Sequence, residues 1–295
     1  MPDYLEDGTI IEHYCLERVL GGGGFSIVYL ATDLRTNEQI VIKEYFPSKL
    51  ATRDKDMSVI PKDDASEKYF RQGRKLFFQE ASILASIDHP NVVKVLGFFQ
   101  AYDTIYTVMK FERGLSLQAY IKKHGKEQSE KLILSVFIPV LRGLKSVHEI
   151  GLLHLDIKPG NIYLRKNNTP VLLDFGAVHK LRLSAGSRLF PVVSHGFSPP
   201  EQTRKNASLG PWTDLYAIGA SMRACIEAKP PLAAKERVKD GKFEPVSKLY
   251  AGKYSSGLLR AIDWAMELEI SNRPQSVDEF LKLIYSLHSD LKKAS

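Results

Sequence analysis

The chain has 295 residues, of which 44% are apolar and 25% are charged, an ordinary composition for a globular protein with a sizeable core. The net charge of +7 comes from basic residues spread along the chain, so we interpret it as a solvated surface and expect no nucleic-acid partner. No apolar run reaches the length of a membrane-spanning helix, which argues against a membrane span.

The two cysteines and the N-terminus bear on location. Cys15 and Cys225 lie far apart and have neither metal-ligand nor redox spacing, so we expect reduced structural thiols in a cytoplasmic setting. The N-terminal sequence MPDYLEDGTIIE is acidic and lacks the basic start and apolar run of a secretory signal. Export into a host cytosol by a route without such a signal stays open.

The first third of the chain is rich in predicted strands. Short β-favouring runs between turn residues predict strands over Ile10–Leu20, Ser26–Thr32 and Gln39–Tyr45. The next segment, Pro47–Ser66, is polar and charged, and we expect it to be an irregular excursion.

A helix and two strands complete this region. Apolar residues at three- and four-residue steps predict a helix from about Glu67 to Ile87. The sequence Asp88-His89-Pro90-Asn91 ends it. Two more strands are predicted over Val92–Gln100 and Ile105–Phe111.

The rest of the chain has mainly helical patterns. A long helix that ends near Gly151 is predicted by one apolar face, made of Leu132, Val136, Val140, Leu144 and Val147. Pro139 lies inside this helix and should kink it or break its hydrogen bonding locally. Later helices are predicted over Asp214–Ala228, Ser256–Met266 and Ser276–Leu287. A β-rich start and an α-rich remainder predict an α+β fold of two lobes with a cleft between them.

Two features of the strand-rich part are ambiguous by themselves. The run Gly21–Gly24 lies between two predicted strands, where glycines let a backbone approach phosphates, but such a run is more often a flexible turn. Lys43 closes an apolar run, and Glu80 follows on the predicted helix. Each alone is an ordinary surface charge, whereas together they can hold the lysine against the phosphates of a nucleotide.

The strongest signal is the sequence His154-Leu-Asp156-Ile-Lys158-Pro-Gly-Asn161, followed by Asp174-Phe-Gly176. Asp156 can accept a hydrogen bond from an attacking hydroxyl. Asn161 and Asp174 offer the hard oxygen ligands that Mg²⁺ prefers, and a predicted strand over Val171–Leu173 delivers Asp174.

From about Tyr14 to Leu287 these motifs, in this order, resemble the protein-kinase superfamily. The resemblance implies a bilobal protein-kinase-like fold in which residues 1–295 form a single domain. Its β-rich N-lobe would span about 10–111, the hinge about 110–113 and the α-helical C-lobe about 114–288, with a nucleotide cleft between the lobes. It also implies ATP, Mg²⁺ (with Mn²⁺ as an alternative ion) and a protein substrate with a serine or threonine.

The resemblance also implies residue roles. Asp156 would be the catalytic base, Lys158 would steady the phosphoryl group, and Lys43 would contact the phosphates while paired with Glu80. Asn161 and Asp174 would hold the metal. Nucleotide binding would fall to Leu20, Gly21, Gly23, Phe25, Val28, Lys43, the gatekeeper Met109, and the hinge residues Lys110 and Glu112.

Further matches lie in the second lobe. Pro199-Pro200-Glu201 resembles the motif that closes the activation segment, and Arg273 stands where the family places the partner of this glutamate. Asp214 and Gly219 have the spacing of the family's buried helix. Lys158 resembles serine/threonine kinases, and Ser194 aligns with a hydroxyl residue that bridges Asp156 and Lys158.

One departure from the pattern bears on regulation. Leu155 replaces the arginine that in many kinases binds a phosphorylated residue of the activation loop, and leucine cannot make a charge-assisted hydrogen bond. We therefore predict activity without activation-loop phosphorylation, although Ser184 and Ser187 stay open to modification. Three smaller departures are Ser26 in place of a third glycine, Val41 in place of an alanine and Pro199 in place of an alanine. Together with the run Ile42–Pro47 and the insertion Pro47–Ser66, they resemble the eukaryotic-like serine/threonine kinases of bacteria.

Two other functions share parts of this pattern. A small-molecule phosphotransferase of the aminoglycoside or choline kinase type has a similar catalytic loop, but the Pro199–Glu201 motif, Asp214 with Gly219, and Arg273 argue against it. A pseudokinase scaffold is the non-enzymatic alternative. The complete set of residues predicted for catalysis and metal binding argues against a pseudokinase.

Overall fold

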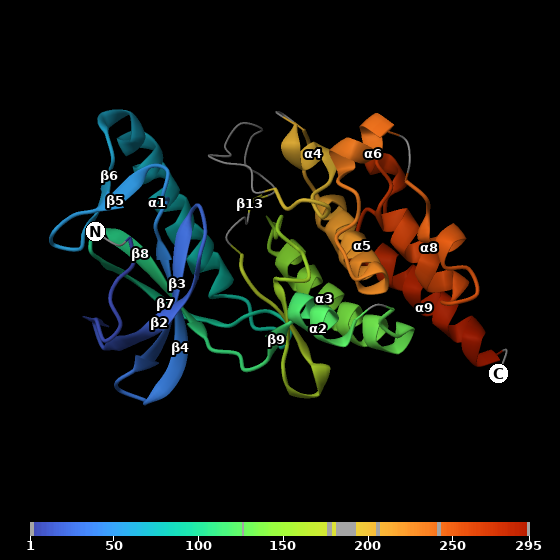
Figure 1. The fold of residues 1–295 in the computed structure, drawn as a ribbon, viewed down its shortest axis with the longest axis horizontal. Coiled ribbons are helices and arrows are strands. Elements are labelled where there is room, and N and C mark those ends of the chain that lie inside the picture. The colour runs from blue at the N-terminus through green and yellow to red at the C-terminus, as the bar shows by residue number, and fades with distance from the viewer. Residues whose placement is uncertain are drawn as a thin grey trace. The chain divides into compact units, whose positions relative to one another are not determined.

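The computed structural model describes residues 3–125, 127–175, 179–180, 193–204, 207–240 and 243–293. The chain forms two units (Figure 1). The N-terminal unit consists of Met1–Asp88 and Val93–Glu112, and the C-terminal unit consists of His89–Val92 and Arg113–Ser295.

The N-terminal unit contains most of the strands. Its elements are β1 (Ile10–Ile11), β2 (Tyr14–Gly22), β3 (Ser26–Asp33), β4 (Glu38–Tyr45), β5 (Ala51–Arg53), β6 (Val59–Pro61), α1 (Asp64–Leu84), β7 (Val95–Ala101) and β8 (Thr104–Lys110). An antiparallel six-stranded sheet has the order β1-β2-β3-β4-β8-β7. The predicted strands of this region are therefore confirmed, with Ile10–Leu20 divided into β1 and β2.

The register of this sheet sets the two faces apart. Successive residues of a strand point to opposite faces, and residues paired across antiparallel strands share a face. Tyr29 pairs with Ile42, which pairs with Val108, and all three are buried. Val28 pairs with Lys43 and therefore lies on the opposite face. One face thus belongs to the hydrophobic core, and the other carries the lysine predicted to bind phosphate.

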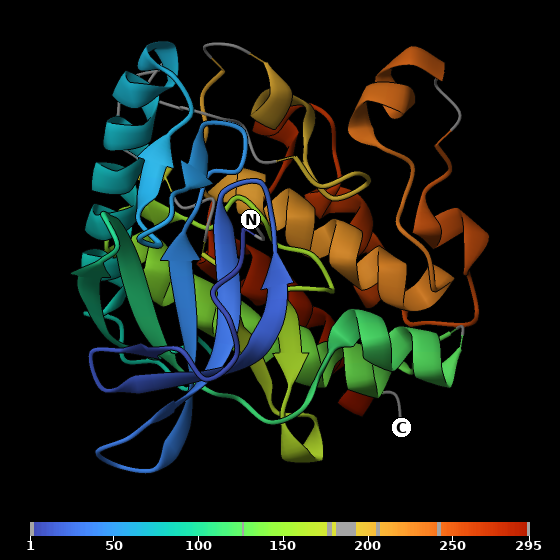
Figure 2. The same cartoon turned by 60° about the vertical axis from the view of Figure 1, so that its left-hand side comes forward.

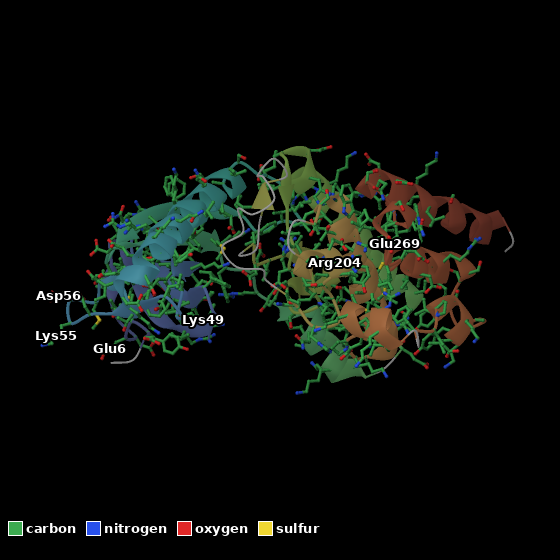
Figure 3. All side chains as sticks on the ribbon, turned by 90° about the horizontal axis from the view of Figure 1, so that it is seen from above. Glu6, Lys49, Lys55, Asp56, Arg204 and Glu269 are labelled. Carbon is green, nitrogen blue, oxygen red and sulfur yellow. The ribbon has the colours of Figure 1, made fainter. Side chains whose placement is uncertain are left out.

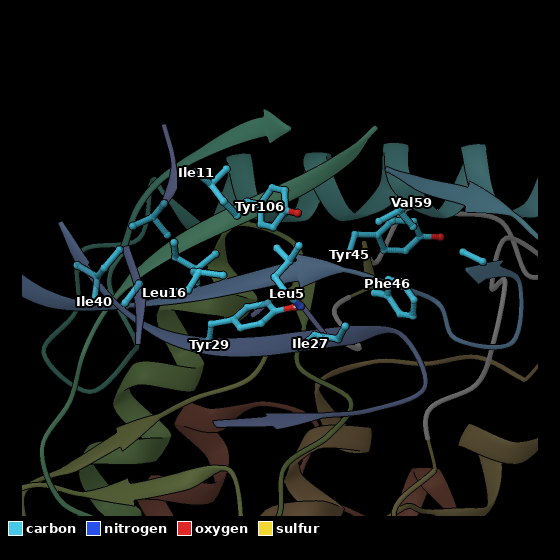
Figure 4. Close-up of a cluster of buried hydrophobic side chains, with 14 of the residues drawn as sticks. Leu5, Ile11, Leu16, Ile27, Tyr29, Ile40, Tyr45, Phe46, Val59 and Tyr106 are labelled. Atoms are coloured by element: carbon cyan, nitrogen blue, oxygen red, sulfur yellow. The ribbon is translucent and has the colours of Figure 1, made fainter. Parts of the chain in front are cut away.

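The hydrophobic core of the N-terminal unit also takes in the chain start and the segment after β4. Figure 4 shows this cluster, in which the labelled side chains are Leu5, Ile11, Leu16, Ile27, Tyr29, Ile40, Tyr45, Phe46, Val59 and Tyr106. Burial of apolar area on this scale is what holds a twisted antiparallel sheet together.

The segment Pro47–Ser66 is not the irregular excursion that its polarity predicted. It contains the hairpin β5–β6, in which Ala51 pairs with Pro61 and Arg53 pairs with Val59. Ala51 and Val59 join the core cluster, and the Val59 N–H donates to the Tyr102 carbonyl at 2.8 Å. Strands of three residues are too short for an alternating pattern to stand out in a charged segment.

Helix α1 begins three residues earlier than predicted and ends three residues earlier, at Leu84. Asp63 caps its N-terminus, because the Asp63 carboxylate accepts the Ser66 N–H at 2.8 Å. The buried side of the helix includes Phe70 and Ala81. It packs on β7 and β8, as Figure 2 shows.

The C-terminal unit is mainly helical. Its elements are β9 (Leu115–Ser116), α2 (Leu117–His124), α3 (Glu130–Glu149), β10 (Leu152–Leu153), β11 (Ile162–Leu164), η1 (Lys166–Asn168), β12 (Pro170–Leu172), β13 (His179–Lys180), α4 (Pro200–Thr203), α5 (Pro211–Glu227), α6 (Ala234–Asp240), α7 (Val246–Leu249), α8 (Ser256–Ala265), η2 (Ile270–Asn272) and α9 (Val277–Lys293). The long helix predicted to end near Gly151 is α3, and the three later predicted helices are α5, α8 and α9. Helix α3 runs on through Pro139.

Helix α5 is the centre of this unit. Every residue from Thr213 to Ile226 is buried, as expected of a helix that is enclosed by other elements on all sides. Helices α3 and α8 pack on it, and a Cβ at Gly219 would lie 2.7 Å from the Cβ of Ala265. Glycine at this position therefore allows α5 and α8 to approach closely.

The surface of both units carries charged side chains. Figure 3 labels Lys49, Arg204 and Glu269 among them, and all three are exposed. Among the described residues, no helix is both long and apolar enough to cross a membrane.

Candidate active site

The segment from His154 to Asn161 connects β10 to β11, and hydrogen bonds to Asp214 on α5 hold its first residues. The backbone N–H groups of His154 and Leu155 donate to the Asp214 carboxylate at 2.9 and 2.8 Å. The side-chain amide of Gln202 donates to the Leu155 carbonyl at 2.5 Å. Leu155 has a φ of +61°, which is rare for a residue with a side chain. These bonds therefore hold a strained turn directly before Asp156.

Asp214 is fully buried, and its charge is compensated locally. In addition to the two backbone donors, it accepts a hydrogen bond from His148 Nε2 at 2.8 Å. Burial raises the pKa of Asp214, but the hydrogen bonds from His148 and the His154 backbone outweigh burial, so the pKa lies below its usual value. Asp214 thus remains an acceptor for the backbone of the loop.

His154 joins Asp156 to the segment that carries Asp174. Its Nδ1 accepts the Asp156 N–H at 3.2 Å, and its Nε2 donates to the Leu173 carbonyl at 3.0 Å. Complete burial lowers the pKa of His154, which favours the neutral ring that this pair of bonds requires. The Phe175 ring lies 4.5 Å from the imidazole, centre to centre.

The Asp156 carboxylate is surrounded by three side-chain donors. Lys158 Nζ lies 3.0 and 2.8 Å from its two oxygens, Ser194 Oγ donates to Oδ1 at 2.6 Å, and Asn161 Nδ2 donates to Oδ2 at 2.9 Å. Lys158 Nζ is also 3.1 Å from Ser194 Oγ, which confirms the predicted bridge between Asp156, Lys158 and Ser194. The arrangement fixes the orientation of the carboxylate.

Asn161 and Asp174 stand at one end of the hairpin formed by β11 and β12. Ile162 pairs with Leu172, and the Leu173 N–H donates to the Asn161 carbonyl at 2.8 Å. Asn161 therefore lies beside Leu173, the residue directly before Asp174. Because Asn161 Nδ2 donates to Asp156, its Oδ1 is left as the side-chain atom that can bind a cation. An amide oxygen and a carboxylate form a donor set that fits Mg²⁺, which keeps water and phosphate as its other ligands.

The remaining predicted residues belong to the N-terminal unit. Lys43 is buried on β4, and Glu80 is half-buried on α1. Met109 pairs with Val41, so Met109 shares a sheet face with Lys43 and Val28, opposite to the hydrophobic core. The structure thus gathers three predicted nucleotide-binding side chains on one face of the sheet.

The glycine run occupies the end of β2 and the turn into β3. None of its four glycines has a positive φ. A Cβ at Gly21, Gly23 or Gly24 would meet no described atom within 4 Å. Neither the backbone conformation nor packing within the described residues requires glycine at these positions. Glycine here leaves space next to the backbone open. Leu20 precedes this run on β2, and Phe25 follows it.

The chain around the predicted hinge leaves the sheet where the two units divide. Lys110 is the last residue of β8 and is exposed, and Glu112 is the last residue of the N-terminal unit. The predicted binding of adenine by the backbone here stays a prediction, as does the pairing of Lys43 with Glu80.

A buried ionic cluster next to Lys43 was not predicted. Glu44, fully buried on the core face, accepts two hydrogen bonds from Arg53 at 2.9 and 2.8 Å and one each from Tyr29 and Tyr106. Arg53 also donates to the Asp3 carbonyl at 3.1 Å. The sequence could have predicted the burial of Glu44. Side chains alternate along a strand, so Glu44 faces the core if Lys43 faces away from it.

The predicted pair of the second lobe is present. Arg273 Nη1 and Nη2 contact Glu201 Oε1 and Oε2 at 2.7 and 3.1 Å, and Thr213 Oγ1 donates to Oε1 at 3.1 Å. Both charged side chains are buried. Ser184, Ser187 and Gly176 lie outside the described residues.

Comparisons with known proteins agree with this geometry. A model of the protein kinase domain matches residues 14–292. The chain is 31% identical over 291 residues to serine/threonine-protein kinase D of Synechocystis, covering 95% of this chain and 53% of that protein. It is 26% identical to serine/threonine-protein kinase PrkC of Bacillus subtilis, covering 76% and 32%. The solved structure of the PpkA-294 apo form matches with a TM-score of 0.81 at 32% identity, covering 96% of this chain and 99% of that chain.

A curled antiparallel sheet with one long helix, followed by a helical unit that presents Asp156 and Asn161, is the protein-kinase fold. The chain belongs to the protein kinase domain family. It spans about half the length of the Synechocystis relative and about a third of the Bacillus relative.

Proposed function

We propose that this chain is a serine/threonine protein kinase that transfers the γ-phosphate of ATP to a protein hydroxyl. The observation that carries the proposal is the Asp156 carboxylate held between Lys158, Asn161 and Ser194. A carboxylate fixed in this way is suited to accept a proton from an attacking hydroxyl. The relatives named as serine/threonine kinases support the choice of hydroxyl.

The hydrogen bonds of Asp156 suggest how a substrate enters. A carboxylate has about four lone-pair sites, and Lys158, Ser194 and Asn161 use two on each oxygen. Lys158 bonds to both oxygens, so a turn of its ammonium group towards the transferring phosphate frees a site on each. The substrate hydroxyl then donates to Asp156 as its oxygen bonds to the γ-phosphorus, the bond from that phosphorus to the bridging oxygen breaks, and ADP leaves.

The other predicted residues bind and orient the nucleotide. Lys43, oriented by Glu80, neutralises phosphate charge, while the backbone at Gly21 and Gly23 covers the phosphates and Val28 with Met109 contacts the base. Leu20 and Phe25 flank the glycine run, and the backbone of Lys110 and Glu112 binds the adenine edge. Asn161 Oδ1 and the Asp174 carboxylate would hold Mg²⁺. The ion supplies charge neutralisation at the phosphates when bound.

The same site supports a finer proposal about regulation. Leu155 is 6% exposed, and the turn that carries it is held by Asp214 and Gln202, which are both buried. In this chain the order of the catalytic loop therefore comes from internal hydrogen bonds. We propose that catalysis does not require a phosphate on the activation loop.

A cytoplasmic location fits the state of the thiols. Cys225 is buried within α5, where burial raises the pKa of its thiol, and a protonated thiol is unreactive. Both cysteines are free. We propose that the chain works in a reducing compartment.

Transfer of labelled phosphate from ATP tests the proposed activity. The protein is incubated with labelled ATP, Mg²⁺ and either mixed proteins or a panel of amino-sugars and choline. We expect label in protein, recovered as phosphoserine and phosphothreonine after acid hydrolysis. Label in a small molecule alone would identify a small-molecule phosphotransferase, and no transfer to either would identify a scaffold.

A further inference from the structure

A cavity of about 510 Å³ lies in the C-terminal unit, next to the side chains that hold Asp156. Its walls come from α2, from the segment Lys158–Gly160, from the turn Ser194–Phe197 and from the end of α5. Lys158 and Ser194, which contact the Asp156 carboxylate at 2.8 and 2.6 Å, line it directly. A polypeptide that presents a hydroxyl to Asp156 therefore has neighbouring residues within reach of this cavity.

The residues that line the cavity are either basic or uncharged. Lys122 and Lys229 are exposed, Lys158 is half-buried, and no described lining residue is acidic. Lys158 is bound to Asp156, whereas Lys122 and Lys229 form no hydrogen bond or ion pair with any described residue.

The acidic residues nearest to these lysines in sequence are already paired. Glu227, two residues before Lys229, forms an ion pair with Arg223 at 2.8 Å. Glu127, beyond Lys122, pairs with Lys253 at 2.8 Å. The positive charge at the cavity is thus left without a countercharge from these neighbours.

The walls of the cavity are tied to one another. The Gln118 N–H donates to the Pro159 carbonyl at 3.0 Å, which joins α2 to the catalytic loop. Gly196 has a φ of +82°, and a Cβ there would lie 2.5 Å from the Pro231 carbonyl, so the 194–197 turn packs directly on the segment after α5. Ile121 and Phe197 give the cavity a buried apolar floor. These contacts fix the walls of the cavity relative to one another.

We propose that this cavity selects the substrate: it binds an anionic side chain, a carboxylate or a phosphorylated residue, next to the acceptor serine or threonine. Lys122 and Lys229 are the residues that recognise it. The apolar floor accommodates the carbon part of that side chain and its neighbour. This inference rests on the proposed protein kinase activity and adds the class of its substrate.

Serine peptides that differ at one flanking position test the selection. A reference peptide carries glutamine at each position around the serine, and each position is replaced in turn by glutamate, phosphoserine or lysine. We expect at least one position at which glutamate or phosphoserine raises kcat/KM about fivefold over glutamine and lysine lowers it, a size typical of one partly exposed charge pair. The glutamate and phosphoserine arms tell which anion is preferred.

Charge reversal locates the effect. Lys122→Glu and Lys229→Glu should each lower kcat/KM for the preferred anionic peptide about tenfold while leaving the glutamine peptide within twofold of wild type. Lys123→Glu is the matched control, because Lys123 is exposed on the same turn of α2 but does not line the cavity. It should change neither peptide.

Two results would overturn the inference alone: phosphorylation of the glutamine peptide with no preference for an anion, or a preference that survives both reversals. If no peptide and no protein is phosphorylated, the proposed kinase activity itself is wrong.

Discussion

Leu155 precedes Asp156, at the position where the kinase pattern has an arginine. Its backbone N–H and carbonyl are both bonded, to Asp214 and Gln202, and its side chain is buried. An arginine here could bind a phosphate through charge-assisted hydrogen bonds, whereas leucine offers only apolar contact. Leu155 itself therefore cannot bind a phosphate, which is the basis of the proposal that catalysis does not require one on the activation loop.

The double variant Ser184→Ala/Ser187→Ala tests this consequence. Because no arginine precedes Asp156, we expect its turnover on protein substrate to stay within about threefold of wild type. Wild-type protein treated with a phosphatase serves as the control and should behave in the same way. A loss of tenfold or more in the double variant would refute independence from phosphorylation.

The residues proposed to carry the chemistry were recognisable in the sequence, whereas the buried residues around them were harder to predict. Asp156 and Asn161 stand out because their types and spacing suit a base and a metal ligand. In the structure, Asn161 Nδ2 lies 2.9 Å from Asp156 Oδ2. Arg53 lay in a polar segment and gave no sign of burial, yet it neutralises Glu44 in the core. A buried carboxylate requires such a partner, but its identity depends on tertiary packing.

Among the helices and strands, the pair Glu201–Arg273 joins three elements of the C-terminal unit. Glu201 lies on α4, Arg273 follows η2, and Thr213 at the start of α5 donates to the same carboxylate. Arg273 also donates to the carbonyls of Glu267 and Leu268 at 2.6 and 2.8 Å. Loss of this arginine would leave a buried carboxylate without a countercharge.

We predict that Arg273→Met lowers the free energy of unfolding by about 3–5 kcal/mol, the usual cost of an uncompensated buried charge. Urea unfolding followed by circular dichroism gives this quantity. The double variant Glu201→Gln/Arg273→Met should recover a large part of the loss. Lys248→Met removes an exposed ion pair with Glu244 and should cost less than about 1 kcal/mol. Equal effects of Arg273→Met and Lys248→Met would contradict this account.

The sequence predicted which long segments form helices, but it did not predict the residues at which these helices begin and end. The periodic patterns gave α3, α5 and α9, because an amphipathic or fully apolar stretch of this length has few other folds. The start of α1 was placed at Glu67 when the cap is Asp63, since cap residues also favour turns. The β5–β6 hairpin was missed because its strands have three residues each.

At the scale of the whole molecule, the change from strands to helices along the chain corresponds to the division between the two units. One exception is His89–Val92, which belongs to the C-terminal unit although it lies between α1 and β7. Asn91 Nδ2 donates to the Pro170 carbonyl at 2.7 Å, and the Leu172 N–H donates to the Asn91 carbonyl at 2.8 Å. Such a long-range exchange leaves no local pattern in the sequence.

The proposed activity draws on both units. Lys43 and Glu80 belong to the N-terminal unit, whereas Asp156, Asn161 and Asp174 belong to the C-terminal unit. The organisation of residues 1–295 as one kinase domain, with these groups acting on a single nucleotide, stays a prediction.

The most direct measurement is the rate of phosphoryl transfer by Asp156→Ala, together with its affinity for ATP. If Asp156 is the base, transfer should fall at least 100-fold while the Kd for ATP stays within about threefold of wild type. Asp278→Asn, which alters an exposed carboxylate paired with Lys145, should leave both values unchanged. An Asp156→Ala variant that keeps more than a third of the wild-type rate would contradict the account.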